Sequence, residues 1–125
     1  MTAKTILVAE DEYDLLSALT TTLTEAGYTV VAAHDGEEAL ALFASAQPDM
    51  ILLDIHMPKK SGLQVLNQIR QTAEGKAIPI SIVTASEELG AVSDVLDVGG
   101  VHTDFLTKTD FSLEQIKQHV ESRLG

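Results

Sequence analysis

The chain has 125 residues and a formal net charge of −11, from 19 acidic and 8 basic residues. That charge argues against nucleic-acid-binding and anionic-membrane-binding classes, because it would repel both and the basic residues form no stripe. The absence of cysteine excludes disulfides and zinc–thiolate sites, and we find no signal peptide or membrane-spanning apolar run, so we expect one cytoplasmic domain over residues 1–125.

Apolar runs alternate with amphipathic segments along the chain. Short continuous apolar runs predict strands, and apolar side chains that recur every three or four residues predict helices. The five predicted strands cover residues 6–9, 28–33, 50–53, 78–83 and 104–107. Five helices are predicted. The first covers about 13–26 and is ended by Gly27, and the second opens at 35–38 and ends before Pro48. The third runs through Leu63, Leu66 and Ile69, the fourth runs through Leu89, Val92 and Leu96 and is ended by Gly99 and Gly100, and the fifth begins with a capping box of Ser112 and Gln115.

This alternation predicts an α/β fold. Short apolar strands separated by helices are typical of a parallel sheet that is covered by helices on both faces. Right-handed crossovers then bring the carboxyl ends of all strands to one edge, and ligands bind at this edge where the strand order reverses. We therefore predict a (βα)5 three-layer sandwich whose functional residues lie at the carboxyl edge of the sheet.

Polar side chains follow four of the predicted strands. Asp54 follows the third strand, the acidic run 10–12 the first, Thr84 the fourth and Lys108 the fifth. Converging carboxylates repel one another unless a cation lies between them, and oxygen-only ligands suit Mg²⁺ or Mn²⁺. Stabilisation of a helix N-terminus would explain the acidic run alone. It does not explain the joint placement of that run with Asp54 and Lys108.

Several short motifs occur together at the expected strand ends. They are Glu10 and Asp11 after the first strand, Asp54 followed by Met57, Pro58 and Gly62, Thr84 and Ala85 after the fourth strand, and Lys108 after the fifth. With these residues the chain resembles the receiver domain of two-component response regulators, including the chemotaxis regulators, over essentially its whole length. The resemblance implies a flavodoxin-like fold with a five-stranded parallel sheet in the order 2-1-3-4-5.

The resemblance also implies a phosphorylation-dependent signalling switch of a two-component system or phosphorelay. Asp54 would be the nucleophile that accepts a phosphoryl group from the phosphohistidine of a sensor histidine kinase or phosphotransfer protein. Mg²⁺, with Mn²⁺ as the alternative, would be held directly by Asp11, Asp54 and the backbone carbonyl of His56. Glu10 would act on the ion through water.

Lys108 and the Thr84 hydroxyl would complete the implied site by neutralising charge on the phosphoryl oxygens. In the phosphorylated state Thr84 would move toward the phosphoryl group and Phe105 would turn inward, changing the face formed by the fourth helix, fifth strand and fifth helix. That face would control a downstream protein partner. A homodimer that forms on phosphorylation is compatible with the resemblance. The chain would not be an enzyme beyond catalysing its own aspartyl phosphorylation and dephosphorylation. We expect no output domain in residues 1–125, so a stand-alone regulator and a receiver excised from a longer protein both stay open.

Some positions depart from the family pattern or allow two explanations. Thr109 follows Lys108, where the family usually has a proline joined by a cis bond. A cis bond without proline costs about 2.5–4 kcal/mol, so we predict a trans bond. His56 either tunes the lifetime of the phosphoryl group or is a solvent-facing loop residue. The other histidines fit no short metal-ligand spacing and are predicted at the surface; they are His34, His102 and His119.

Three other functions use a similar framework. A haloacid-dehalogenase-type phosphohydrolase needs a second Asp two residues past its nucleophile, where this chain has His56. A flavin or nucleotide binder needs a Gly-, Ser- or Thr-rich phosphate loop after the first strand, where this chain has acidic residues. A receiver-like interaction module that never carries phosphate is the remaining alternative, favoured by Thr109 and by the unusual segment 99–103.

Overall fold

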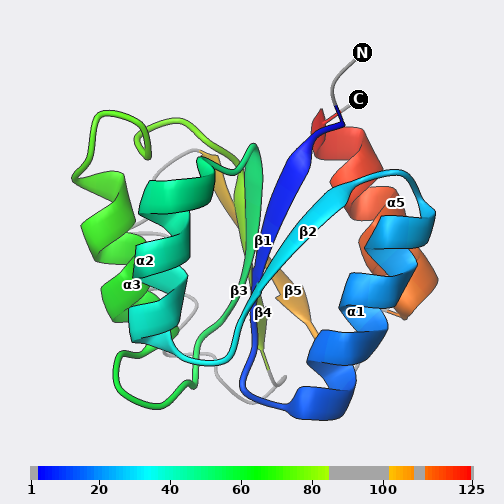
Figure 1. Ribbon diagram of the computed structural model, residues 1–125, viewed down its shortest axis with the longest axis horizontal. Coiled ribbons are helices and arrows are strands. Elements are labelled where there is room, and N and C mark those ends of the chain that lie inside the picture. The colour runs from blue at the N-terminus through cyan, green and yellow to red at the C-terminus, as the bar shows by residue number, and fades with distance from the viewer. Residues whose placement is uncertain (1–2, 85–101, 109–111, 125) are drawn as a thin grey trace.

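Five parallel strands form one sheet at the centre of the molecule (Figure 1). The computed structural model describes residues 3–84, 102–108 and 112–124. The strands are β1 (Thr5–Ala9), β2 (Thr29–Ala33), β3 (Met50–Asp54), β4 (Ile80–Thr84) and β5 (Thr103–Thr107). Their spatial order is β2-β1-β3-β4-β5 and every neighbouring pair is parallel, so the predicted flavodoxin-like sheet is confirmed.

Helices cover both faces of the sheet and give the predicted three layers. The helices in the described part of the chain are α1 (Tyr13–Glu25), α2 (Gly36–Ala46), α3 (Gly62–Arg70) and α5 (Leu113–Leu124). Helices α2 and α3 lie on one face, and α1 and α5 lie on the other (Figure 1). The helix predicted through Leu89, Val92 and Leu96 falls outside the described residues. None of the described helices is long and apolar enough to cross a membrane.

Short-range hydrogen bonds define where helices begin. At the start of α3, Ser61 Oγ accepts a hydrogen bond from the Gln64 N–H at 3.2 Å, and Gln64 Oε1 accepts one from the Ser61 N–H at 2.9 Å. The capping box predicted for Ser112 and Gln115 is confirmed, with distances of 3.1 and 2.8 Å. Both boxes satisfy N–H groups that a helix start leaves without partners, so these boundaries are encoded locally.

Side chains of the strands alternate between two hydrophobic cores. In β1, Leu7 and Ala9 join the core beneath α2 and α3, whereas Ile6 and Val8 join the core beneath α1 and α5. Strand β3 is buried along its whole length because it lies at the centre of the sheet. This burial on both faces explains why its sequence is continuously apolar rather than alternating.

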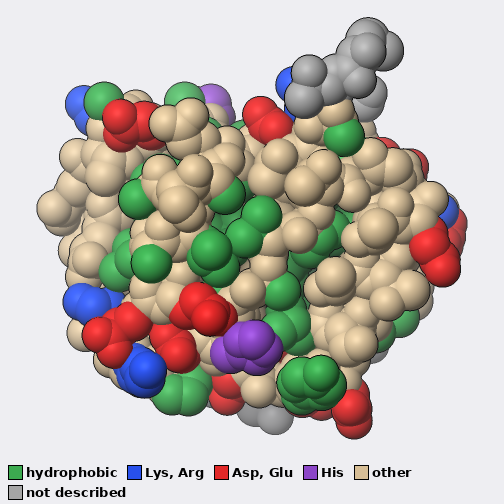
Figure 2. Space-filling model, viewed as in Figure 1, with side chains coloured by type: hydrophobic (Ala, Val, Ile, Leu, Met, Phe, Trp, Pro, Cys, Tyr) green, Lys and Arg blue, Asp and Glu red, His purple; other side chains and the backbone are tan. Residues whose placement is uncertain are grey.

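The strands end at the lower edge of the view in Figure 1. In the space-filling view, acidic, basic and histidine side chains gather at that edge near the N-terminal end of α2 (Figure 2). Hydrophobic side chains are visible higher on the same face, between the helices. This group of ionisable side chains lies at the edge of the sheet where a ligand site is expected, and other charged side chains lie at the upper and right-hand edges of the same view.

Candidate functional site

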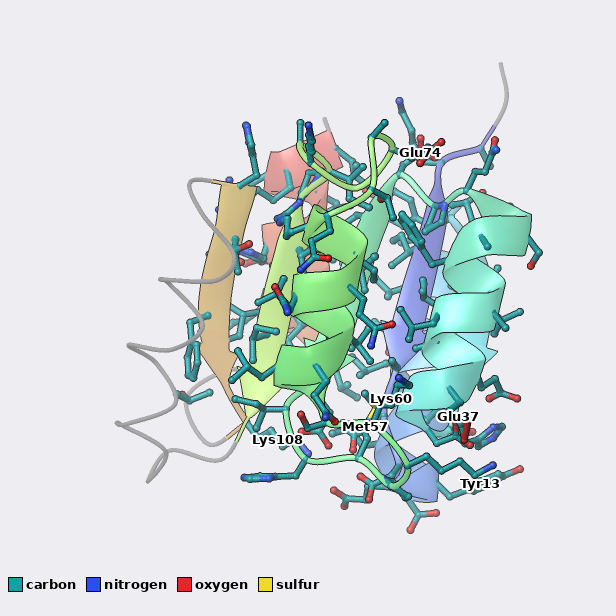
Figure 3. All side chains as sticks on the ribbon, turned by 90° about the vertical axis from the view of Figure 1, so that its left-hand side faces the viewer. Tyr13, Glu37, Met57, Lys60, Glu74 and Lys108 are labelled. Carbon is teal, nitrogen blue, oxygen red and sulfur yellow. The ribbon has the colours of Figure 1, made fainter. Side chains whose placement is uncertain are left out.

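The strand register brings four predicted site residues to one edge of the sheet. Glu10 follows β1 and Asp54 ends β3, and the pairing of these strands makes the two residues neighbours. Thr84 ends β4 beside Thr107 of β5, and Lys108 comes next in the chain. Figure 3 shows Lys108 at the same edge as the loop that follows β3.

Three carboxylates converge at this edge. One oxygen from each of Glu10, Asp11 and Asp54 lies within 4.8 Å of the others. Glu10 and Asp54 are only 1% and 5% exposed, whereas Asp11 is exposed to solvent. The Lys108 ammonium lies 3.1 Å from Glu10 Oε1, 3.5 Å from Asp54 Oδ2 and 3.9 Å from Glu12 Oε2. The structure thus brings two buried acids, an exposed acid and a lysine together at the edge where the sequence analysis expected these residues to lie.

Burial makes the negative charge of this cluster costly. Burial and a hydrogen bond with Asp54 raise the pKa of Glu10 to about 7. Burial also raises the pKa of Asp54, although its hydrogen bond with Glu10 and the charge of Lys108 oppose that shift. Burial works against the charge of Lys108, but its hydrogen bond to Glu10 and its attraction to Asp54 prevail and raise its pKa. One ammonium therefore does not fully compensate the carboxylates.

A divalent cation with oxygen ligands fits this arrangement. Glu10 Oε1 is buried and accepts no hydrogen bond from the part of the chain that the structure describes, although the Lys108 ammonium lies 3.1 Å from it. Within the described ranges, Lys108 is the cation at ion-pair distance from Glu10 and Asp54. Clustered carboxylate oxygens are the ligands that Mg²⁺ and Mn²⁺ prefer. The donor set therefore fits the Mg²⁺ or Mn²⁺ ion that the resemblance implies.

Backbone contacts hold both ends of the 55–61 loop close to Asp54. At its start, the His56 N–H donates a hydrogen bond to Asp54 Oδ1 at 3.3 Å. At its end, the Gly62 N–H donates to the Ile55 carbonyl at 2.8 Å, and a Cβ on Gly62 would lie 2.1 Å from the Asp54 carbonyl oxygen. Only glycine permits this approach. The His56 side chain is exposed, which is compatible with both explanations given for it.

The remaining predicted residues belong to β4 and β5. The backbone of Thr84 reaches the same edge as Lys108 through its register with β5. Phe105 is half-buried and packs against the core beneath α2 and α3. Thr109 lies outside the described residues, and so does the geometry of the bond that joins it to Lys108.

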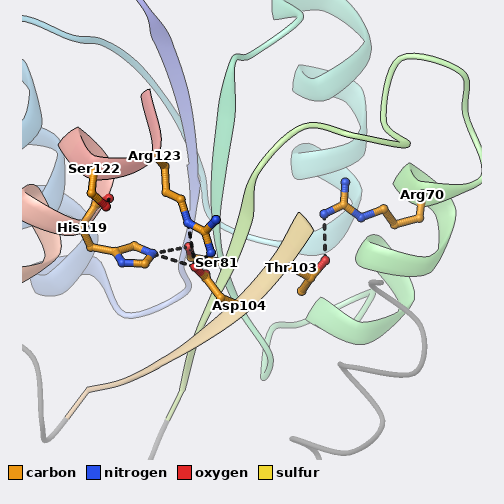
Figure 4. Close-up of polar contacts among 7 residues, drawn as sticks. All are labelled: Arg70, Ser81, Thr103, Asp104, His119, Ser122 and Arg123. Carbon is orange, nitrogen blue, oxygen red and sulfur yellow. Dashed lines mark hydrogen bonds and ion pairs between the residues drawn. The ribbon is translucent and has the colours of Figure 1, made fainter. Parts of the chain in front are cut away.

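A polar cluster ties α5 to the strands that lead to Lys108 (Figure 4). The Asp104 carboxylate of β5 accepts hydrogen bonds from the Ser81 hydroxyl of β4 and from the Arg123 guanidinium of α5. His119 Nε2 lies 3.1 Å from Ser81 Oγ and 3.0 Å from Asp104 Oδ2. His119, which the sequence predicted at the surface, is partly buried in this cluster, with 20% of its side chain exposed. The helical spacing of α5 showed its apolar face but not this polar contact.

A second cluster anchors the other end of β5. The Arg70 guanidinium donates hydrogen bonds to the carbonyls of Gly75 and Ile78 at 2.7 and 2.8 Å, and to Thr103 Oγ1 at 2.7 Å. Burial lowers the pKa of Arg70. Arg70 and Thr103 are 33 positions apart, so no local pattern could have revealed their contact.

Two further histidines and an aromatic residue are at the surface. His34 and His102 are exposed, as predicted. The His34 ring stacks on Tyr13 with 6.4 Å between ring centroids, and its Nδ1 lies 2.9 Å from Glu38 Oε1. Tyr13 is 71% exposed and begins α1, close to the acidic cluster in the chain. No local pattern predicts this stack, because its two rings come from different elements.

Comparison with known proteins gives matches over nearly the whole chain. A family model described as the response regulator receiver domain matches residues 6–121. "Response regulator MprA" of Mycobacterium ulcerans is 39% identical over 119 residues, which cover 95% of this chain and 49% of that protein. "Response regulator MprA" of Mycobacterium tuberculosis strain H37Rv is 38% identical over 119 residues, covering 95% and 50%. The chain spans about half the length of the curated relatives that it matches.

Solved structures give the same result for the fold. Vibrio cholerae chemotaxis protein CheY4 superposes with a TM-score of 0.89 and 28% identity, covering 98% of this chain and 100% of that one. A putative response regulator from Chloroflexus aurantiacus superposes with a TM-score of 0.88 and 28% identity, covering 98% of each chain. These matches extend over the sheet, its helices and the edge that carries the acidic cluster.

Proposed function

Because the chain belongs to the family of response regulator receiver domains, we propose that it is a phosphorylation-dependent switch whose phosphoacceptor is Asp54. A phosphorylation switch in two-component signalling is the general role of this family. In this chain, Asp54 would receive the phosphoryl group, and Lys108 and Thr84 would neutralise its charge. The acidic cluster of Glu10, Asp11 and Asp54 would hold the metal ion.

The observation that carries this proposal is the position of the Asp54 carboxylate. It is buried at the end of the central strand, its Oδ1 accepts the His56 N–H, and its Oδ2 lies 3.5 Å from the Lys108 ammonium. A buried carboxylate with fixed orientation and an adjacent cation is suited to nucleophilic attack on an anionic group. A purely structural acid would not need two further carboxylates beside it.

The transfer itself needs little covalent chemistry from the protein. One Asp54 oxygen attacks the phosphorus of a phosphohistidine, the phosphorus–nitrogen bond breaks, and the imidazole nitrogen keeps the electron pair while an aspartyl phosphate forms. The transition state of phosphoryl transfer is loose, so positioning and charge stabilisation dominate. The raised pKa of Lys108 keeps its ammonium protonated near neutral pH, where it can approach the phosphoryl oxygens.

The residues that would hold Mg²⁺ are those of the acidic cluster and the following loop. Asp11 and Asp54 would bind directly, the backbone carbonyl of His56 would be the third protein ligand, and Glu10 would act through water, with Mn²⁺ as a substitute ion. A bound Mg²⁺ supplies positive charge to the phosphoryl oxygens. The protein's own contribution is to hold the carboxylates together against their mutual repulsion.

We further propose that a sensor histidine kinase or phosphotransfer protein donates the phosphoryl group, in the cytoplasm. On phosphorylation, Thr84 and Phe105 would rearrange and change the surface that includes β5 and α5, which controls a downstream protein and can support a homodimer. The chain would act on no separate substrate, and its catalysis would be limited to its own phosphorylation and dephosphorylation. Residues 1–125 would form the receiver domain.

The test is intact mass spectrometry after incubation with acetyl phosphate and Mg²⁺. We expect one phosphoryl adduct that is lost when Mg²⁺ is chelated and in Asp54→Asn. If the chain takes no adduct under conditions that label a control receiver, the phosphate-independent interaction module becomes the better description.

A further inference from the structure

We propose that Asp35 and Gly36, the turn before α2, position the β3–α3 loop and thereby set the affinity of the acidic cluster for its divalent cation. The turn follows β2 and is not among the residues that would hold the cation or the phosphoryl group. The inference rests on the proposed function in that the cation site is the site of the phosphoryl switch.

Gly36 makes direct backbone contact with the tip of the loop. Its N–H donates a hydrogen bond to the Pro58 carbonyl at 3.3 Å. A Cβ at position 36 would lie 2.2 Å from the Lys60 carbonyl oxygen and 2.6 Å from the Lys60 Cβ. The first of these distances is about 1 Å short of ordinary van der Waals contact. An alanine at this position therefore forces the loop tip and the turn apart.

The loop tip that rests on Gly36 has an unusual backbone. The Lys60 N–H donates a hydrogen bond to the Pro58 carbonyl at 2.8 Å, which closes a three-residue turn around Lys59. Lys59 has a φ of 69°, a region that residues other than glycine rarely adopt. Such a conformation costs about 1–3 kcal/mol and persists only when its surroundings impose it. Here the Gly36 N–H provides a second hydrogen bond to the same Pro58 carbonyl.

Asp35 holds the same tip through its side chain. One carboxylate oxygen accepts a hydrogen bond from the Glu38 N–H at 2.8 Å, which caps α2. The other oxygen lies 3.5 Å from the Lys59 ammonium. The hydrogen bond from the Glu38 backbone and, less strongly, the charge of Lys59 lower the pKa of Asp35. The residue therefore links the start of α2 to the residue with the unusual backbone.

A displacement of this tip is transmitted to the acidic cluster of Glu10, Asp11 and Asp54, because the base of the loop is held in place by close contacts. Gly62 is in close contact with the Asp54 carbonyl, and its N–H is bonded to Ile55. Met57, between the base and the tip, packs against the core beneath α2 and α3. The loop can therefore adapt to a displaced tip mainly near His56, whose N–H orients the Asp54 carboxylate. Outer contacts that orient metal ligands typically change metal affinity 10–100-fold.

The experiment compares two glycine substitutions with nearly equal steric conflict. A Cβ at Gly36 would lie 2.2 Å from the carbonyl oxygen of Lys60, and a Cβ at Gly75 would lie 2.1 Å from that of Ile69. Gly75 lies next to Glu74, which is at the opposite edge of the molecule from Lys60 in Figure 3. Calorimetric titration with Mg²⁺ should show affinity at least about 10-fold weaker in Gly36→Ala and unchanged in Gly75→Ala.

Three further measurements do not depend on phosphorylation, and the last two do not depend on the stability of Gly36→Ala. Amide hydrogen exchange of the metal-free protein should be faster over residues 55–61 in Gly36→Ala than in Gly75→Ala. Asp35→Asn keeps a good helix cap and removes only the charge that faces Lys59, so it should weaken Mg²⁺ binding without loss of the helix. Lys59→Ala should weaken it similarly.

The outcomes separate this inference from the proposed function. If the wild type binds Mg²⁺ and accepts the phosphoryl group while Gly36→Ala and Asp35→Asn bind Mg²⁺ as tightly as it does, the inference is wrong and the switch stands. If Gly75→Ala weakens Mg²⁺ binding as much as Gly36→Ala, the effect is one of general stability and the inference is also wrong. If the wild type binds no Mg²⁺, the proposed site and this inference fall together.

Discussion

Glu10→Gln should stabilise the metal-free protein at pH 8 and leave its stability nearly unchanged at pH 4. Glu10 is 1% exposed, and its pKa rises from 4.5 to about 7 on folding. Each pKa unit corresponds to about 1.4 kcal/mol, so the ionised carboxylate lowers the free energy of unfolding by about 3 kcal/mol. Glutamine is always neutral, has nearly the same shape and can donate the hydrogen bond that Glu10 makes with Asp54.

The direction of the pH dependence follows from the raised pKa. Below pH 4.5 the Glu10 carboxyl is protonated in both the folded and the unfolded state, so its titration costs no stability. Between pH 4.5 and 7 the unfolded chain releases this proton while the folded protein keeps it, and the stability of the wild type falls relative to Glu10→Gln. Above pH 7 the difference is complete. Because Glu10 and Asp54 interact, the curve reports the titration of the pair.

Urea unfolding in chelator, at half-unit steps from pH 4 to pH 8, measures this difference directly. Saturating Mg²⁺ should then stabilise the wild type more than Glu10→Gln, because the positive ion offsets the unfavourable burial of the ionised Glu10 carboxylate. Glu12→Gln is the control: its side chain is 64% exposed and 3.9 Å from Lys108, so its effect on stability should be small throughout. A difference between wild type and Glu10→Gln that does not vary with pH would refute the reasoning.

Three further predictions concern other parts of the fold. Gly62→Ala should slow phosphorylation by acetyl phosphate by about 100-fold, because its Cβ would displace the Asp54 backbone; a rate within twofold of wild type would contradict this. Asp104→Asn should lower the free energy of unfolding by about 1–3 kcal/mol, because Arg123 and the half-buried His119 lose their shared carboxylate; urea unfolding tests it, and no change would mean that solvent replaces these contacts. Leu66→Ala should cost about 2–5 kcal/mol with an unchanged urea m-value, since Leu66 is fully buried; a loss below 1 kcal/mol would show that the core collapses around the cavity.

Local signals predicted the described strands and helices but not every limit: the strand predicted at 78–83 is β4, which covers Ile80–Thr84. The capping box of Ser112 and Gln115 sits where the sequence placed it, and the strand predicted at 50–53 is the central strand β3. The strand order needed more than periodicity, and it came from the family resemblance. The cluster of Glu10, Asp54 and Lys108 was predictable because parallel strands deliver their carboxyl ends to one edge.

Contacts between distant segments were not predictable in this way. The links from Arg70 to Thr103 and from His119 to Asp104 depend on how helices pack across the sheet, and a helical pattern does not specify which polar side chain meets which strand. The same holds for Gly36, which the sequence showed only as the opening of α2. Its contact with the Lys60 backbone exists because two loops meet above the sheet edge.

The sequence by itself therefore determined the alternation of strands and helices and the kinds of side chain at each strand end, because hydrophobic period and capping chemistry act over a few residues. Only the tertiary structure decided the distances among those side chains, the burial that raises the pKa of Glu10, and the support of the β3–α3 loop by the turn before α2. These depend on packing between segments far apart in the chain, which no local pattern records.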